Sequence, residues 1–181
     1  AFYQADTMRI CGVGKIVPVK GFDKLARIHK RLMDEGCKVH TYILGIGSQR
    51  EEIEKYLRDN NLEDSFTFLG YQTNPYKYVS KCDLFVCSSV AEGFSTAATE
   101  ALIVGTPVVT TPVAGMKEML GNHNEYGVIT EMSEESLYEN IKKLILNGEK
   151  LAQYKKQAEI RGKDFSKENT VKAVEEMLLK L

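Results

Sequence analysis

Six segments rich in apolar and β-branched residues recur along the chain. Most of them are continuously apolar rather than alternating, which is typical of strands buried on both faces of a parallel sheet. The segments are Met8–Val13, Val39–Leu44, Ser65–Leu69, Asp83–Cys87, Pro107–Thr111 and Tyr126–Thr130. The pattern therefore predicts a buried parallel sheet of about six strands.

Between these segments, apolar residues recur at helical spacing. The first helix is predicted from Phe22 to Gly36, where the glycine ends it, and the second opens at Ser48 and Glu51, which fit a capping box. A further helix is predicted over Ser95–Val104. Another has Leu137, Ile141 and Leu144 on one face and ends near residues 147–148, and the last covers residues 166–181. Strands and helices alternate with short loops, so we predict a Rossmann-like, doubly wound α/β fold.

Length and composition fit one globular domain. The chain has 181 residues, of which 43% are hydrophobic and 27% charged, and this excludes a disordered or low-complexity chain. We assign residues 8–165 to the domain, residues 1–7 to a tail or the remnant of a connection, and residues 166–181 to a C-terminal helix. The formal net charge of -1 argues against a nucleic-acid partner. No apolar stretch approaches the ~20 residues of a membrane span.

The chain has 4 cysteines, and none of them forms a CxxC pair. A zinc site is therefore not expected. Three of the cysteines, Cys11, Cys82 and Cys87, lie in or beside apolar runs. We expect reduced thiols packed as small hydrophobes.

In a fold of this class, ligands bind beyond the carboxyl ends of the strands. The loop after the first strand holds Gly14, Lys15 and Lys20 and leads into a helix. Glycines allow close backbone approach, and lysines suit phosphate oxygens. The glycine spacing fits neither a dinucleotide fingerprint nor a Walker A loop. Phosphate binding and solvated surface lysines both remain open for this loop.

The loop after the fourth strand, Ser88–Glu100, carries the strongest site signal. Glu92 precedes the turn, Ser95 or Thr96 can cap the next helix, and Glu100 lies one turn inside that helix. The amides of Gly93–Ser95 would form an anion site at the helix start. Two carboxylates beside an anion site suit a ligand with hydroxyl-rich ends, a sugar nucleotide. A solvated helix face is the alternative for Glu100, but its neighbours are largely apolar.

Two weaker glycine motifs follow the second and third strands. Gly45 and Gly47 are explained by a tight turn before a capped helix, which we favour over ligand contact. Gly70 and Tyr71 follow the third strand, where an aromatic ring could hold a flat base. A turn with a packed tyrosine explains these two residues equally well.

The motifs together resemble a known family. EGFSTAATE is an E-x7-E motif, preceded by CDLFVCSS and followed by ALIVGTPVVTTPVAGMKEML, and GVGKIVPVKGFDKL, YILGIGSQREEIE and FTFLGYQTNPYKYV fit as well. In this order, over residues 9–165, they resemble the C-terminal, donor-binding domain of a GT-B fold, family 4 (group 1) retaining glycosyltransferase. The resemblance implies one half of a GT-B enzyme, with the active site between two Rossmann-like domains.

The resemblance also implies residue roles. Lys20 would bind the donor pyrophosphate, with Lys15 in place of the family's usual Arg, while Glu92 would bind sugar hydroxyls and Glu100 the ribose. The residues expected to contact the donor are Gly14, Lys15, Lys20, Gly70, Tyr71, Glu92, Gly93, Phe94, Ser95, Thr96 and Glu100, with Lys20 and Glu92 as the catalytic residues. A helix dipole and basic groups would neutralise the leaving diphosphate, so neither a metal nor a cofactor is implied.

An N-terminal acceptor domain is implied as the missing partner, toward which the C-terminal helix would pack. We expect this chain to bind a nucleoside diphosphate sugar, with UDP the family's commonest carrier, and to transfer no sugar alone. The segment HNEYGVITEMSEESLYENIKKLI resembles bacterial transferases of capsule, exopolysaccharide or lipopolysaccharide synthesis. A cytoplasmic enzyme is expected, peripheral at the inner membrane face when full length, that transfers a hexose or hexosamine to a polysaccharide or lipid-linked acceptor.

Three other functions are compatible with a sheet of this kind. A GT-B sugar-nucleotide epimerase would share the donor site, but the E-x7-E motif favours the transferase. A nicotinamide-dependent oxidoreductase should carry G-x-G-x-x-G, which is absent. A non-catalytic nucleotide-binding α/β module would leave the convergence of Lys20, Glu92 and Glu100 unexplained.

Overall fold

A computed structural model of the chain describes residues 6–166. Most of the predicted tail, residues 1–7, and nearly all of the predicted C-terminal helix lie outside this range. The amphipathic stripe expected over Val171–Leu181 lies wholly outside it, and its packing toward a second domain stays a prediction.

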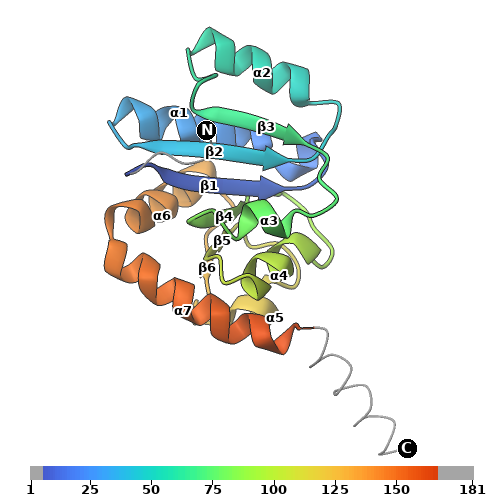
Figure 1. Ribbon diagram of the computed structural model, residues 1–181, viewed down its shortest axis with the longest axis vertical. Coiled ribbons are helices and arrows are strands. Elements are labelled where there is room, and N and C mark those ends of the chain that lie inside the picture. Colours follow the sequence, from blue (N-terminus) through green and yellow to red (C-terminus); the bar gives the residue numbers. More distant parts are fainter. Residues whose placement is uncertain (1–5, 167–181) are drawn as a thin grey trace, which may run out of the picture.

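Within residues 6–166, six strands form one parallel sheet, as the apolar runs predicted. The strands are β1 (Met8–Val13), β2 (Val39–Leu44), β3 (Phe66–Gly70), β4 (Leu84–Cys87), β5 (Val108–Thr110) and β6 (Val128–Ile129). Their order is β3-β2-β1-β4-β5-β6 (Figure 1). The direction of winding reverses between β1 and β4, and this switch point is where open α/β sheets form a ligand crevice.

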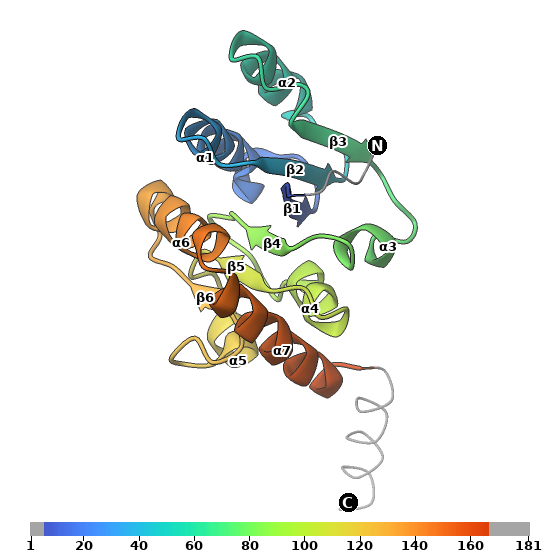
Figure 2. The same cartoon turned by 60° about the vertical axis from the view of Figure 1, so that its left-hand side comes forward.

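Helices cover both faces of the sheet (Figure 2). One face carries α1 (Phe22–Asp34), α2 (Arg50–Asp59) and α6 (Glu134–Leu146); the other carries α3 (Tyr76–Val79), α4 (Thr96–Ile103), α5 (Met116–Leu120) and α7 (Gly148–Asp164). Neighbouring strand residues alternate between the two cores: Ile10 packs on the α1 side and Cys11 on the α4 side. Because the sheet is covered on both faces, most residues of its strands are apolar.

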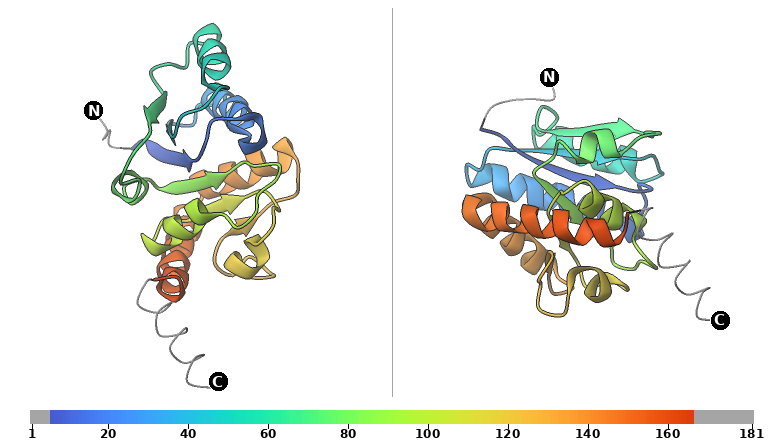
Figure 3. Two further views of the ribbon diagram at one scale, coloured as in Figure 1. Left: turned by 90° about the vertical axis from the view of Figure 1, so that its right-hand side faces the viewer. Right: turned by 60° about the horizontal axis from the view of Figure 1, so that its bottom comes forward.

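Helix α7 was not predicted, and the structure corrects the sequence interpretation here. Helix α6 ends at Leu146, close to the predicted end near residues 147–148, but Gly148 then begins a further helix. The helix packs against α4 (Figure 3), and the approach is so close that a Cβ atom on Gly162 would come 2.2 Å from the Leu102 carbonyl oxygen. The buried residues of α7 are small, Ala158 and Gly162, so it lacks the apolar stripe that marks most surface helices.

The predicted capping box at Ser48 and Glu51 is wrong. Helix α2 begins after Gln49, and no side chain caps its first turn. The Gln49 amide instead donates to the Ile16 carbonyl, 3.0 Å away in the loop after β1. A Cβ atom on Gly47 would come 2.1 Å from that same oxygen. The two glycines after β2 therefore serve the close contact of two loops, with no cap.

The cysteines match their prediction. Cys11, Cys82 and Cys87 are buried, Cys37 is half-buried, and all 4 are free thiols. Burial raises the pKa of the Cys11 thiol well above its ordinary value, and the Cys82 side chain adds to the shift. A thiol held in its neutral form is a poor nucleophile, so Cys11 acts as a core hydrophobe.

Buried His29 makes the stability of the fold depend on pH. Its ring nitrogens Nδ1 and Nε2 form hydrogen bonds with Thr41 Oγ1 at 2.9 Å and with Ser65 Oγ at 2.8 Å. Burial, with a smaller contribution from His40, lowers the pKa of His29 from 6.5 to about 4. The unfolded chain therefore binds this proton more readily, and stability is lost as the pH falls from about 6.5 to about 4.

We expect the free energy of unfolding to fall by roughly 3 kcal/mol across that interval through His29 alone. Urea titrations at several pH values measure this slope, and His29→Asn should remove most of it. An equally steep slope in the variant would assign the effect to other groups, of which half-buried His40, whose pKa is also lowered by burial, is the first candidate.

Candidate functional site

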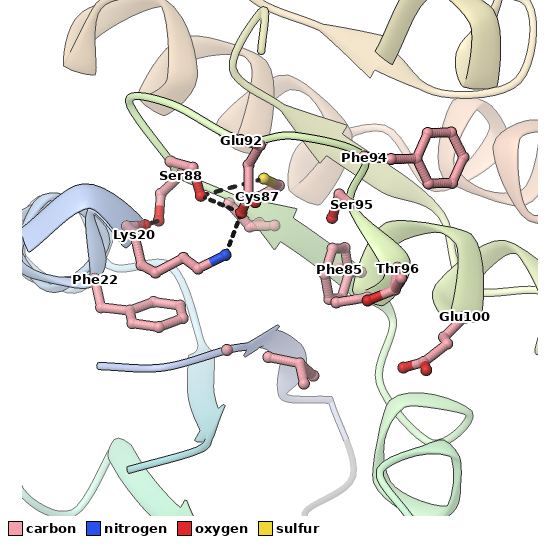
Figure 4. A pocket seen from close by; sticks show the side chains of 15 residues that line it. Lys20, Phe22, Phe85, Cys87, Ser88, Glu92, Phe94, Ser95, Thr96 and Glu100 are labelled. Carbon is pink, nitrogen blue, oxygen red and sulfur yellow. Dashed lines mark hydrogen bonds and ion pairs between the residues drawn. The ribbon is translucent and has the colours of Figure 1, made fainter. Parts of the chain in front are cut away.

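A cavity of about 190 Å³ lies at the switch point of the sheet. It is formed by the carboxyl ends of β1 and β4 and by the first turn of α4. Its lining residues are Val13, Gly14, Lys20, Phe22, Phe85, Val86, Cys87, Ser88, Ser89, Glu92, Phe94, Ser95, Thr96, Ala97 and Glu100. Figure 4 shows Lys20 and Glu92 on one side of this cavity and Glu100 on the opposite side.

Lys20 ends a short 3-10 helix, η1 (Pro18–Lys20), which opens the loop into α1. Gly21 follows with φ 66°, and a Cβ atom there would lie 2.2 Å from the Ser88 carbonyl oxygen. The Ser88 hydroxyl donates to the Lys20 carbonyl at 2.8 Å, and the Val90 amide donates to the Val19 carbonyl at 2.9 Å. Two hydrogen bonds to backbone carbonyls thus join the loop after β1 to the loop after β4.

A chain of polar contacts fixes Glu92. Lys20 Nζ donates to Glu92 Oε1 at 2.5 Å, and the Ser89 hydroxyl donates to the same oxygen at 2.8 Å (Figure 4). Thr111 Oγ1 in turn donates to the Ser89 carbonyl at 2.6 Å. The Lys20 and Glu92 side chains are only 25% and 13% exposed, so the ion pair is shielded from most solvent screening.

The first turn of α4 supplies backbone donors. Ser95 is the N-cap, and its side chain accepts from the Ala98 amide at 3.2 Å, as the sequence predicted. The amides of Thr96 and Ala97 have no carbonyl to pair with inside the helix, and both residues line the cavity. An anion in the cavity would therefore meet a helix N-terminus as well as Lys20.

Glu100 extends from α4 to the far wall of the cavity, where its carboxylate contacts the Tyr76 hydroxyl at the start of α3. Partial burial raises the pKa of Tyr76, and the Glu100 carboxylate adds to the rise because it would repel a phenolate. Glu100 is half-buried rather than solvated, so the alternative of a solvent-facing helix side is wrong.

A second cavity of about 420 Å³ adjoins the first and shares Val13 and Gly14 with it. Its other lining residues are Lys15, Leu44, Gly45, Ile46, Tyr71, Gln72 and Pro75. Tyr71 is 72% exposed, so the alternative of a packed tyrosine in a turn is wrong. The largely apolar lining and the open tyrosine face suit a flat aromatic group.

The structure brings most of the predicted site residues to two adjoining cavities. Gly14, Lys20, Glu92, Phe94, Ser95, Thr96 and Glu100 line the first; Gly14, Lys15 and Tyr71 line the second. The shared loop suggested that Lys15 and Lys20 act together, but exposed Lys15 lines the second cavity and Lys20 the first. Gly93 and Gly70 belong to the loops beside the cavities and line neither of them.

Ser89, Thr111 and Tyr76 were not predicted as site residues. Ser89 stands three positions before Glu92 in a loop, where spacing alone does not indicate a contact. Thr111 follows an apolar strand, and its side chain reaches Ser89 only because β4 and β5 are neighbours in the sheet. Tyr76 belongs to α3, a four-residue helix too short to give a periodic signal.

Across residues 6–166, no group of three His, Cys, Asp or Glu side chains is placed to hold a metal ion. No helix in the same part of the chain is long and apolar enough to cross a membrane. The charged and polar groups that line the cavity are a lysine, two carboxylates, hydroxyls and helix amides. They can bind an anion near Lys20 and hydroxyl groups near Glu92 and Glu100.

The sequence is similar to those of known proteins. Residues 4–161 match the profile of the family described as glycosyl transferases group 1. A Campylobacter jejuni protein, N-acetylgalactosamine-N,N'-diacetylbacillosaminyl-diphospho-undecaprenol 4-alpha-N-acetylgalactosaminyltransferase, is 33% identical over 160 residues, which cover 87% of this chain and 43% of that protein. The lipopolysaccharide core biosynthesis glycosyltransferase LpsD of Rhizobium meliloti is 31% identical over 111 residues, covering 61% of this chain and 31% of that protein. The chain thus spans less than half the length of these relatives.

Solved structures share the fold. Staphylococcus aureus TarM, a variant crystallised with UDP, alpha-GlcNAc-glycerol and fondaparinux, superposes with a TM-score of 0.82 at 26% identity, covering 96% of this chain and 35% of TarM. HepE from Anabaena, in complex with UDP-glucose, superposes with a TM-score of 0.83 at 24% identity, covering 98% of this chain and 50% of HepE. At this identity HepE supports the fold alone.

Proposed function

Because this chain belongs to the group 1 glycosyltransferases, we propose that its cavity binds the nucleoside diphosphate sugar donor of a retaining sugar transfer. The observation that carries the proposal is the meeting of Lys20, Glu92, Glu100 and the start of α4 around one cavity. These groups come from three separate loops and helices, and their chemistry matches the parts of one ligand: a diphosphate, a sugar and a ribose.

The diphosphate fits between Lys20 and the amides of Thr96 and Ala97. An ammonium group and a helix N-terminus both favour negative charge. The same groups would stabilise the charge that develops on the diphosphate as it leaves the sugar, which makes Lys20 a catalytic residue. The backbone of Gly14, Phe94 and Ser95, which line the cavity, would border the phosphates and the sugar, with Gly93 in the loop beside them.

The two carboxylates would bind hydroxyl groups. Glu92, beside Lys20, would accept hydrogen bonds from the donor sugar, and Glu100, on the far wall, would accept them from the ribose. The base would then enter the second cavity, where Tyr71 offers an open ring face and Gly70 ends the neighbouring strand. Lys15 at the rim of this second cavity would add positive charge near the phosphates.

The whole enzyme would carry a second, acceptor-binding domain, because the chain spans less than half of its curated relatives. We infer a UDP-linked hexose or hexosamine as the donor, supported by the UDP ligand in TarM, which has the same fold. A polysaccharide or lipid-linked acceptor is supported by the names of the relatives. Alone, this chain would bind donor and transfer no sugar.

Calorimetric titration with UDP, GDP and ADP, each with and without Mg²⁺, tests the proposal. We expect one nucleotide to bind, with an affinity that Mg²⁺ does not change. Glu100→Ala should weaken that binding at least tenfold, because a hydrogen bond to a charged group is worth about 1.5–3 kcal/mol. Glu139→Ala, which removes an exposed carboxylate of α6, is the matched control. Equal affinities in the two variants would contradict the role of Glu100, and the absence of binding to all three nucleotides would contradict the proposed function.

A further inference from the structure

We propose that Ser89 is a positioning residue that holds the Glu92 carboxylate in place for the donor sugar once Lys20 has turned to the diphosphate. The inference rests on the proposed function. Its starting point is that Lys20 Nζ and the Ser89 hydroxyl donate to the same oxygen, Glu92 Oε1.

A bound diphosphate would change the Lys20 contact. It brings more than one negative charge next to a single ammonium group, which now faces one carboxylate. Lys20 is a flexible side chain with a compact charge, so it can follow the phosphate oxygens. The ion pair between Lys20 and Glu92 would then be weakened, and the phosphates would also repel the Glu92 carboxylate.

The Ser89 contact would not change in this way. A neutral hydroxyl is not drawn toward the phosphates as an ammonium group is. The Ser89 side chain is short, and the residue is only 2% exposed. A charge-assisted hydrogen bond from a neutral donor would therefore still orient Glu92 Oε1, which leaves Oε2 for the sugar hydroxyls.

Ser89 is itself fixed from behind. Its carbonyl accepts from Thr111 Oγ1 at 2.6 Å, and Thr111 is fully buried. The Thr111 amide donates to the Cys87 carbonyl at 3.0 Å. The end of β5 thus holds the end of β4, and the Ser89 hydroxyl has little freedom to move away from Glu92.

The test compares UDP with UDP-glucose and UDP-N-acetylglucosamine by calorimetry. In Ser89→Ala we expect the affinity for the better of the two sugar nucleotides to fall about threefold to tenfold, while the affinity for UDP stays within about twofold. Thr111→Val keeps the Ser89 hydroxyl but removes the hydrogen bond to the Ser89 carbonyl. It should lower the affinity for the sugar nucleotide by a smaller factor than Ser89→Ala does.

Thr106→Val is the matched control, because it also removes a buried hydroxyl, one that donates to the Val79 carbonyl outside the cavity. It should change neither affinity. A merely structural role for Ser89 would lower both affinities together, or lower only the unfolding temperature, and either result would overturn the proposal.

Glu92→Gln separates the two levels of inference. If Glu92→Gln lowers the affinity for the sugar nucleotide but not for UDP, and Ser89→Ala does not do so, the positioning role is wrong and the donor site stands. If Glu92→Gln changes the affinities for the sugar nucleotide and for UDP by the same factor, the role of Glu92 is wrong. The positioning role is then wrong as well.

Discussion

Replacing Lys20 by alanine should weaken UDP binding about 10- to 100-fold. Charge-assisted hydrogen bonds are worth about 1.5–3 kcal/mol, and this lysine is the cation placed on Glu92 inside the cavity. Its side chain is 25% exposed, so solvent screens its charge only in part. The measurement is calorimetric titration with UDP, with the unfolding temperature of each variant recorded beside it.

Two further variants make this result specific. Lys143→Ala removes an exposed lysine of α6 and should leave the affinity unchanged. Lys20→Arg keeps the positive charge and should retain a larger share of the binding than Lys20→Ala. If Lys20→Ala and Lys143→Ala had equal effects, Lys20 would not contact the diphosphate.

Gly21→Ala should damage both the fold and the site. Gly21 has φ 66°, a left-handed conformation that costs an L-residue about 1–2 kcal/mol. Its new Cβ would also meet the Ser88 carbonyl oxygen at 2.2 Å, so backbone must move. Overpacking of this kind costs a further 1–3 kcal/mol or so. We expect a total loss of about 3 kcal/mol in a urea titration, together with weaker UDP binding.

Gly36→Ala is the control for this prediction. Gly36 also has a positive φ, 81°, but a Cβ atom there would meet nothing within 4 Å, and the residue does not line the cavity. In Gly36→Ala the free energy of unfolding should fall only by the cost of the left-handed conformation, about 1 kcal/mol, and UDP binding should be normal. If both variants lost the same stability and bound UDP alike, the close approach of the Lys20 and Ser88 loops would not matter for the site.

The sheet was predictable because its strands are buried on both faces. The segments Met8–Val13 and Val39–Leu44 have the same bounds in the sequence pattern and in the structure. Helix α7 was not predictable from the same signal, because it packs on α4 through Ala158 and Gly162. Gly162 permits the close packing of the two helices, although a glycine inside a helical pattern lowers the signal for a helix.

Many residues that line the two cavities were predicted one by one as candidates, but their contacts with one another were not. Lys20 and Glu92 were selected from separate motifs, and their ion pair joins positions 72 residues apart. Only the neighbouring positions of β1 and β4 in the sheet bring these loops together. The support from Ser89 and Thr111 depends on side-chain direction at two strand ends, which no local sequence pattern specifies.

The structure of this chain in complex with UDP tests the central claim most directly. We expect the diphosphate between Lys20 Nζ and the first amides of α4, the ribose hydroxyls at Glu100 and the uracil ring beside Tyr71. UDP bound away from this cavity, with the phosphates remote from Lys20 and the Lys20–Glu92 ion pair intact, would contradict the assignment of the donor site.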